Sequence, residues 1–265
     1  MKKGKRKARI GSKSLILLTN DDGIGAPGIY ALFLELRKIG DVVIIAPDTE
    51  RSAVGHAITI SDPLRVWPYE KNGHFFGYAV NGTPADCVKI GRWALLERKP
   101  DLVVSGINLG PNTGINTIYS GTVSAATEGA LLGIPSFAIS LATYQHPDFR
   151  FAGKFGRKLA LCLLQNGLPS GVYLNVNVPA CPEKEIKGVA ITRQGLARYE
   201  EKFDRRMDPN GRMYYWLTGQ KVNKETDLSV DDGAVQANWV AVTPVHYDLT
   251  KYDFIETLKS WNLKK

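Results

Sequence analysis

Residues 15–28 read LILLTNDDGIGAPG, an apolar run that leads into two adjacent aspartates and three spaced glycines. The apolar run is typical of a buried strand, and Pro27 suits the first turn of a helix whose apolar residues continue at three- and four-residue steps. Gly23, Gly25 and Gly28 also have the G-x-G-x-x-G spacing of a dinucleotide-binding loop. The stretch predicts a strand–loop–helix unit and leaves open what the loop binds.

The same alternation of strand and helix continues over roughly the first two thirds of the chain. Short apolar runs predict strands, and amphipathic stretches between them predict helices. The strands are expected at 15–19, 42–46, 102–105, 136–140 and 172–178, and the helices after Pro27 and at 84–98, 122–132 and 152–166. Apolar strands separated by helices indicate a parallel sheet covered on both faces. We expect an α/β fold, a Rossmann-like three-layer sandwich with a mostly parallel sheet.

Two regions depart from this rhythm. Residues 63–80 predict two strands around a turn at Lys71-Asn72-Gly73. From about residue 186 the pattern becomes alternating, which predicts a long hairpin that turns at Asp208-Pro209-Asn210-Gly211 and protrudes as an arm. The expected elements here are strands near 188–193, 197–203, 213–219 and 239–242, and a closing helix at 251–260.

The net charge of +8 is concentrated at the N-terminus. The first 14 residues carry seven lysines and arginines and no acid, so the rest of the chain is close to neutral. We interpret residues 1–14 as a basic, flexible, solvated arm, with an RNA or membrane-surface tether as the alternative. No apolar run is long enough to span a bilayer or to serve as a signal peptide, so we expect a cytoplasmic protein with no membrane partner.

The residues around the three glycines argue against a dinucleotide-binding loop. Asp21 and Asp22 stand between the strand and the glycines, where their charges would repel a pyrophosphate in a crevice of low dielectric constant. The candidate ribose-binding acid, Asp48, lies beyond Pro47 instead of closing its strand. A lone glycine pattern is a weak signal, and here its neighbours argue against it.

The same two carboxylates that repel a pyrophosphate would attract a divalent cation. Ser52 follows the second strand and Asn108 follows the strand at 102–105. If the first strand lies between those two, Asp21, Asp22, Ser52 and Asn108 meet at the carboxyl edge of the sheet. Such an all-oxygen set favours one Mg²⁺ or Mn²⁺ ion. Taken alone, Asp-Asp-Gly also fits a plain turn, and we interpret its second copy at 231–233 as a turn in a polar loop.

An anion site is predicted close by. Ser120, Gly121 and Thr122 precede a helix of small residues, and backbone N–H groups and hydroxyls at a helix N-terminus bind phosphate. The Gly- and Asn-rich loop upstream adds Asn112 as a further phosphate ligand. A cation site beside an anion site indicates a metal-dependent reaction on a phosphate, with Asp21 and Asp22 as the catalytic residues.

Four blocks in this order resemble the survival protein SurE family: LLTNDDGIGAPGI, APDTERSAVGHAIT, NGTPADCV and SGINLGPNTGINTIYSGTVSAATEGALLGIPSFAIS. The segment TDLSVDDGAV…VAVTPVHYDLT resembles the C-terminal region of that family, so the likeness covers residues 15–255. One departure is Ala53, where many members have glycine. The resemblance implies a metal-dependent nucleotidase with one divalent metal on Asp21, Asp22, Ser52 and Asn108.

The resemblance also implies hydrolysis of nucleoside 5′- and 3′-monophosphates, in some members of short polyphosphate, and a homodimer or homotetramer with hairpin contacts. We divide the chain into the basic arm (1–14), a Rossmann-like metal- and phosphate-binding core (15–185), and a hairpin arm with a C-terminal oligomerisation segment (186–265). Either a water or one of the two aspartates is the expected nucleophile. A non-catalytic nucleotide or phosphate sensor is the alternative, and nucleic acid is not an expected partner.

Overall fold

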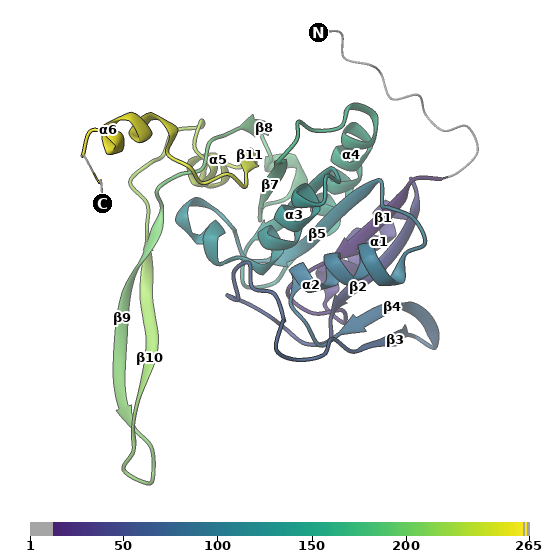
Figure 1. Cartoon of the computed structure of the whole chain (residues 1–265), viewed down its shortest axis with the longest axis horizontal. Helices are drawn as coiled ribbons and strands as arrows, with labels where there is room; N and C mark the ends of the chain where they lie inside the picture. Colours follow the sequence, from purple (N-terminus) through teal and green to yellow (C-terminus); the bar gives the residue numbers. More distant parts are fainter. Residues whose placement is uncertain (1–12, 262, 264–265) are drawn as a thin grey trace.

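The computed structural model describes residues 13–261 and 263. Nearly all of the basic arm at 1–14 therefore lies outside the described residues, and its predicted flexibility and its alternative role as an RNA tether stay predictions. The described residues form a helix-covered sheet and a separate two-stranded hairpin (Figure 1).

The main sheet has nine strands in the order β3-β4-β2-β1-β5-β6-β7-β11-β8. Its six central strands, from β4 to β7, run parallel, whereas β3 and the pair β11 and β8 run in the opposite direction. The strands are β1 (Leu15–Thr19), β2 (Asp41–Pro47), β3 (Val66–Lys71), β4 (His74–Val80), β5 (Leu102–Leu109), β6 (Ser136–Ala142), β7 (Val172–Pro179), β8 (Gly188–Ile191) and β11 (Trp239–His246). The predicted mostly parallel sheet is confirmed.

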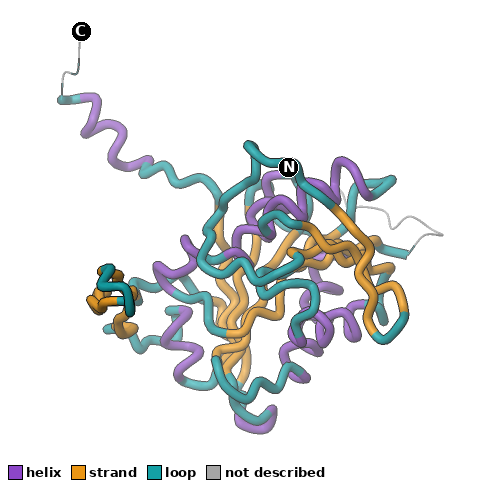
Figure 2. Tube along the Cα trace, turned by 90° about the horizontal axis from the view of Figure 1, so that it is seen from below, coloured by secondary structure: helices purple, strands orange, loops and turns teal. Residues whose placement is uncertain are grey.

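Helices cover both faces of this sheet, as Figure 2 shows from a second direction. The helices α1 and α4 pack against each other on one face, and α2 and α3 pack against each other on the other face. Their bounds are α1 (Pro27–Leu36), α2 (Pro84–Ile90), α3 (Gly121–Leu131) and α4 (Arg150–Asn166). The helix predicted at 84–98 is shorter than expected, because α2 gives way at Gly91 to one π-helical turn that ends at Leu95.

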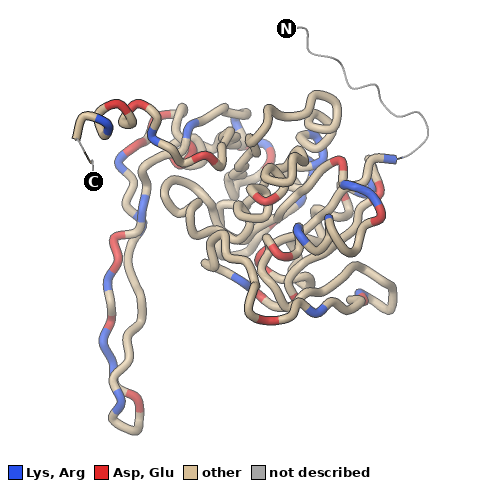
Figure 3. The backbone as a smooth tube through the Cα atoms, viewed as in Figure 1, with Lys and Arg blue, Asp and Glu red and all other residues tan. Residues whose placement is uncertain are grey.

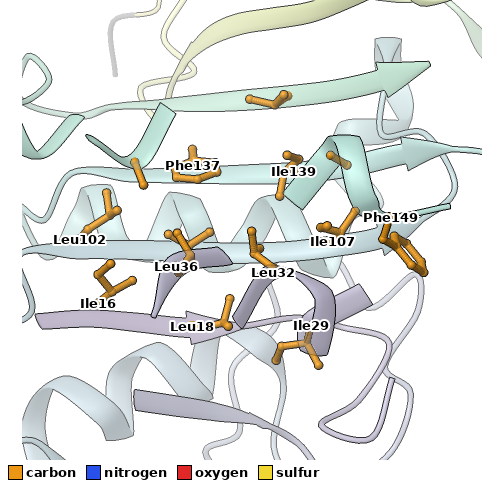
Figure 4. Packing of buried hydrophobic residues seen from close by; sticks show 14 of the residues in the cluster. Ile16, Leu18, Ile29, Leu32, Leu36, Leu102, Ile107, Phe137, Ile139 and Phe149 are labelled. Carbon is orange, nitrogen blue, oxygen red and sulfur yellow. The ribbon is translucent and has the colours of Figure 1, made fainter. Parts of the chain in front are cut away.

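The first strand shows how the sequence builds two cores. Side chains alternate across a strand, so Ile16 and Leu18 join the cluster under α1 and α4, whereas Leu17 joins the cluster under α2 and α3. All three side chains are fully buried. Figure 4 shows Ile16 near Leu36 of α1, and Leu18 near Leu32 and Ile29 of the same helix. An unbroken apolar run is therefore required here, and it fixes β1 at the centre of a three-layer sandwich.

The hairpin predicted at 63–80 forms one edge of the sheet. Its strands β3 and β4 are antiparallel and meet at Asn72 and Gly73, which have φ values of +54° and +74°. Positive φ at both positions is what a tight two-residue hairpin turn requires. β4 then pairs in parallel with β2, so the hairpin extends the main sheet instead of standing apart from it.

The C-terminal part contributes to both units. The strands β9 (Arg198–Met207) and β10 (Met213–Val222) form the hairpin arm, which projects away from the sheet in Figure 1. Within the same region β8 and β11 extend the nine-stranded sheet. A short helix α5 (Asp231–Gln236) precedes β11, and α6 (Ile255–Lys259) follows it near the end of the chain. No helix among the described residues is long and apolar enough to cross a membrane.

The third glycine of the opening stretch serves helix packing. A Cβ atom at Gly28 would lie 2.0 Å from the carbonyl oxygen of Ile107 in β5, and a backbone atom cannot move aside as a side-chain tip can. By contrast, a Cβ at Gly153 of α4 would have its nearest neighbour at 3.3 Å, a side-chain carbon of Glu35. Gly28 therefore lets α1 lie close against the sheet.

We expect Gly28→Ala to lower the free energy of unfolding by about 1–3 kcal/mol, because overpacking exceeds the gain in helix propensity. Gly153→Ala is the matched control and should be close to neutral. Urea denaturation of both variants checks this. Equal stability of Gly28→Ala and the unchanged protein would show that α1 does not depend on this contact.

Candidate metal and phosphate site

The order of the central strands brings the predicted metal ligands to one edge. β1 lies between β2 and β5, so the loops after all three strands leave the sheet side by side. The backbone N–H of Leu109, at the end of β5, donates to Oδ2 of Asp22 at 3.2 Å. The N–H of Arg51, in the loop that carries Ser52, donates to the carbonyl oxygen of Asp21 at 2.7 Å. The loops that carry Asp21, Asp22, Ser52 and Asn108 therefore lie next to one another, and metal binding by these four residues stays a prediction.

The turn that carries the two aspartates is held by its own neighbours. The side-chain amide of Asn20 donates to the carbonyl oxygen of Gly23 at 2.8 Å, and the N–H of Ile24 donates to that of Pro47 at 2.8 Å. Gly23 has a φ of +93°, a conformation that other residues rarely adopt. These contacts fix the direction in which the aspartates leave β1.

Asp21 is buried and faces the start of α3. The hydroxyl and the backbone N–H of Thr122 both donate to its carboxylate. Burial raises the pKa of Asp21, and these hydrogen bonds oppose that rise. A Cβ at Gly121 would lie 2.8 Å from Cβ of Asp21, so only a glycine allows the helix to approach this closely. Thr122, predicted as a phosphate ligand, therefore has both donors directed to Asp21.

Asp22 is the more accessible of the pair. Burial, and then the negative charge of Asp21, raise the pKa of Asp22 to about 7. Within the described residues, no lysine, arginine or histidine forms an ion pair with either aspartate. Two adjacent carboxylates without a cationic side chain are costly to ionise, and a bound cation removes that cost.

Glu50 is a third carboxylate that the sequence argument missed. Its Oε1 accepts a hydrogen bond from the hydroxyl of Ser52 at 2.6 Å. Its charge also raises the pKa of both Asp21 and Asp22, which places it close to the pair. The sequence signal for Glu50 is its position, two residues before the predicted ligand Ser52 in the same loop.

The oxygen atoms of the predicted metal ligands suit a hard divalent cation. The side-chain N–H₂ of Asn108 donates to the carbonyl oxygen of Gly110 at 2.7 Å, which leaves the amide oxygen as the group for a ligand. Among the described residues no three His, Cys, Asp or Glu side chains form a metal-binding group, so the set here depends on amide and hydroxyl oxygens as well. Carboxylate, amide and hydroxyl oxygens are ligands that Mg²⁺ and Mn²⁺ accept.

Three of the predicted phosphate ligands, Ser120, Gly121 and Thr122, lie at the N-terminus of α3, whereas Asn112 lies against β6 and β7. The Oγ of Ser120 caps the helix by accepting from the N–H of Val123 at 3.1 Å, and its own hydrogen stays available to an anion. Asn112 is buried, and its side-chain amide donates to Oγ of Ser140 at 2.9 Å. Gly121 begins the helix directly beside Asp21. Ser120 and Gly121 are thus the best placed donors of the predicted set.

His56 follows the Ser52 loop and has a partner on α3. Its Nε2 lies 3.0 Å from Oε2 of the buried Glu128, whose Oε1 lies 3.0 Å from Nζ of Lys89. Burial alone would raise the pKa of Glu128, but the hydrogen bonds from His56 and Lys89 lower it. His56 therefore anchors the loop that carries Ser52 to α3.

Ala53 shows the physical meaning of the departure from the family pattern. It has a φ of +57°, in the left-handed region where a Cβ is costly and glycine is favoured. The glycine that the resemblance implies at this position would fit that conformation. In this chain the loop keeps the same backbone with alanine.

The interpretation of the second Asp-Asp-Gly as a turn in a polar loop is wrong. Asp231 and Asp232 are 0% and 3% exposed, and they begin the helix α5. Backbone and hydroxyl donors from distant parts of the chain satisfy their carboxylates. The sequence does not indicate this burial, because no apolar strand precedes the pair and its partners lie far away in the chain.

A mostly parallel sheet covered on both faces, with an acidic loop and a helix N-terminus meeting at its carboxyl edge, defines a Rossmann-like α/β protein with a candidate metal and phosphate site. Comparison with known proteins narrows this class. The model of the family described as survival protein SurE matches residues 16–201. The chain belongs to the survival protein SurE family, as its sequence blocks predicted.

Curated relatives agree over nearly the whole length. A protein named 5′-nucleotidase SurE from Syntrophobacter fumaroxidans is 54% identical over 248 residues, covering 94% of this chain and 99% of the relative. A protein of the same name from Chlorobium phaeobacteroides is 51% identical, covering 96% and 98%. The crystal structure of the SurE protein from Aquifex aeolicus matches with a TM-score of 0.81 at 42% identity, covering 93% of this chain and 99% of that one.

The contact between Thr122 and Asp21 leads to a prediction about metal binding. Thr122→Val keeps the shape of the side chain and removes the hydroxyl donor, so Mn²⁺ affinity should fall by roughly 10–100-fold. Thr127→Val is the matched control, because the Thr127 hydroxyl donates to the carbonyl oxygen of Val123 within the same helix. Calorimetric titration with Mn²⁺ measures both. Equal affinities in the two variants would show that the Thr122 hydroxyl does not support metal binding at Asp21.

Proposed function

We propose that this protein is a metal-dependent phosphomonoesterase that hydrolyses nucleoside 5′-monophosphates to nucleoside and phosphate. One observation carries the proposal: buried Asp21, the first of the aspartate pair after β1, directly contacts the N-terminus of α3 through Thr122. A cation on the aspartates and a phosphate on the helix N-terminus would therefore be immediate neighbours. Relatives that are 50–54% identical over almost their full length are named 5′-nucleotidases, which agrees with this activity.

The residues of the chain divide the work between them. Asp21, Asp22, Ser52 and Asn108 hold one Mg²⁺ or Mn²⁺ ion, which supplies charge neutralisation and polarisation of the phosphate. Ser120 and Gly121 donate to the remaining phosphate oxygens, and the helix N-terminus adds its positive potential. Thr122 keeps Asp21 in place. Asn112 supports the loop above the phosphate and, with its second amide hydrogen, donates to it.

Asp22 is the better placed of the two aspartates to act in the reaction, because Asp21 is buried under α3. It either orients the attacking water or attacks phosphorus itself. In both cases a new P–O bond forms opposite the ester oxygen, the ester P–O bond breaks, and the nucleoside leaves with a proton from solvent. Direct attack by Asp22 leaves an aspartyl-phosphate, which a water then cleaves at phosphorus to release phosphate and restore the carboxylate. Rapid quenching of a single turnover with ³²P-labelled AMP separates the two routes, because only direct attack leaves ³²P on the protein.

The test is release of phosphate from AMP with Mg²⁺ or Mn²⁺ present. We expect activity that EDTA abolishes, and Asp22→Ala should lower kcat by roughly 10²–10³-fold because it removes a charge that organises the transition state. Asp41→Ala, at an exposed aspartate that begins β2 at the opposite end of that strand from the Ser52 loop, is the matched control and should keep full activity. The 3′-monophosphate and a short polyphosphate are included as further substrates.

Two results would overturn the proposal. Activity that survives both EDTA and Asp22→Ala would exclude this site as the catalytic centre. Nucleotide binding without any phosphate release would favour the phosphate sensor. The cytoplasm stays our expectation for the compartment in which the reaction takes place.

We further propose that the hairpin arm holds copies of the chain together in a homodimer or homotetramer. Phe203 faces Leu217 across the arm, and Met207 faces Met213, all of them exposed. The charged side chains of the arm lie mainly on β9, whereas β10 is largely uncharged (Figure 3). A two-stranded sheet with apolar residues in water is marginally stable alone, and a second copy would cover them.

Replacing Phe203 and Leu217 by serine should shift the protein towards monomer, because about 2 kcal/mol of burial is lost per side chain. Lys202→Ser is the control, since successive residues of a strand face opposite sides. Sedimentation velocity over a range of protein concentrations reads the assembly state. An unchanged assembly in the double variant would show that the arm is not the contact.

A further inference from the structure

The second Asp-Asp-Gly is buried against the segment that connects the metal and phosphate sites. This connecting segment, residues 110–119, begins two residues after Asn108 and ends directly before Ser120. Both of its ends therefore adjoin the candidate site. The N–H of Leu109 donates to Asp22 at one end. At the other end the carbonyl oxygen of Tyr119 accepts from the N–H of Gly55, in the loop that carries Ser52, at 3.0 Å.

Asp231 and Asp232 hold the middle of this connecting segment. Oδ2 of Asp231 accepts from the N–H of Gly114 at 2.9 Å, and its Oδ1 accepts from the N–H of Gly195 at 2.9 Å. Oδ1 of Asp232 accepts from the hydroxyl of Thr113 at 2.8 Å. Because Thr113 and both aspartates are buried, water does not compete for these contacts.

Lys221 completes the group from the base of the hairpin arm. It is the residue before the last of β10, and its ammonium forms an ion pair with Asp232. Its Nζ also donates to Oγ1 of Thr113 at 2.8 Å, so the hydroxyl of Thr113 accepts from the lysine and donates to the aspartate. The base of the arm and the connecting segment therefore share one charged hydrogen-bond network.

The other strand of the arm reaches the same segment. The N–H of Ile115 donates to the carbonyl oxygen of Ala197, directly before β9, at 2.9 Å. The side-chain amide of Gln194 donates to the carbonyl oxygen of Gly114 at 2.9 Å. Residues 113–115 are thus attached to both strands of the arm at its base.

We propose that Asp231, Asp232 and Lys221 are positioning residues that hold residues 113–114 and thereby set the geometry of the phosphate ligands at Asn112 and Ser120. The inference rests on the proposed function, because it assigns these residues to phosphate binding in that same site. None of the three touches the substrate. Their effect reaches it through the connecting segment, and the base of the hairpin arm is part of the support.

The test uses Lys221→Met, which removes the charge and keeps the length of the side chain. We expect KM for AMP and the inhibition constant of inorganic phosphate to rise together, by roughly tenfold, because a small displacement of a binding group weakens it strongly. kcat should change much less than KM, and Mn²⁺ affinity should stay the same. Lys221→Arg, which keeps the charge, should recover part of the loss.

Lys224→Met is the matched control, an exposed lysine three residues further on. If Lys221→Met is too unstable to study, Lys221→Met combined with Asp232→Asn removes both charges at once and avoids an unpaired buried carboxylate. The double variant is expected to show the same selective loss of phosphate affinity. Unfolding temperatures of all variants accompany the kinetic measurements.

Calorimetric binding of inorganic phosphate in the presence of Mn²⁺ separates this inference from the proposed function. If the unchanged protein hydrolyses AMP and Lys221→Met binds phosphate with unchanged affinity, the function stands and the positioning role is wrong. If kcat, metal affinity and unfolding temperature all fall while KM rises, the network is only structural and the inference is overturned. If the unchanged protein binds phosphate but hydrolyses nothing, the proposed function fails while the binding comparison still tests the network.

Discussion

The repulsion between Asp21 and Asp22 is the constraint on which the site depends. Both carboxylates are held at the end of the buried strand β1, and burial and the charge of Asp21 raise the pKa of Asp22 to about 7. Glu50 adds a third negative charge nearby. A chain that keeps such a cluster ionised needs a positive partner, and no described side chain forms an ion pair with the aspartate pair. The fold therefore fits a cation and the anionic substrate that a cation attracts.

Close packing places the N-terminus of α3, the candidate phosphate site, next to these carboxylates. Gly28 lets α1 lie on β5, and Gly121 lets α3 approach Asp21 until Thr122 can hydrogen-bond to it. A side chain at either position would push a helix away from the sheet. The glycines that first resembled a dinucleotide loop thus serve the turn at Gly23 and the packing at Gly28.

The two Asp-Asp-Gly sequences show how context decides the role of the same letters. The first follows a buried strand and faces the edge of the sheet, where ligands enter. The second is sealed inside, where Asp231 and Asp232 bind Gly114, Gly195, Thr113 and Lys221. One pair is short of partners and fits a metal, whereas the other is saturated with donors and holds the backbone.

The sequence by itself determined the family, the three-layer α/β sheet and the loops that carry Asp21, Asp22, Ser52 and Asn108. Local patterns are sufficient to predict these features, because buried strands, helix caps and turns can be recognised from consecutive residues. Only the tertiary structure decided the contact of Thr122 with Asp21, the proximity of Glu50, the length of the hairpin arm and the burial of Asp231 and Asp232. These depend on segments up to 119 residues apart in the chain, as between Thr113 and Asp232, and only folding brings such partners together.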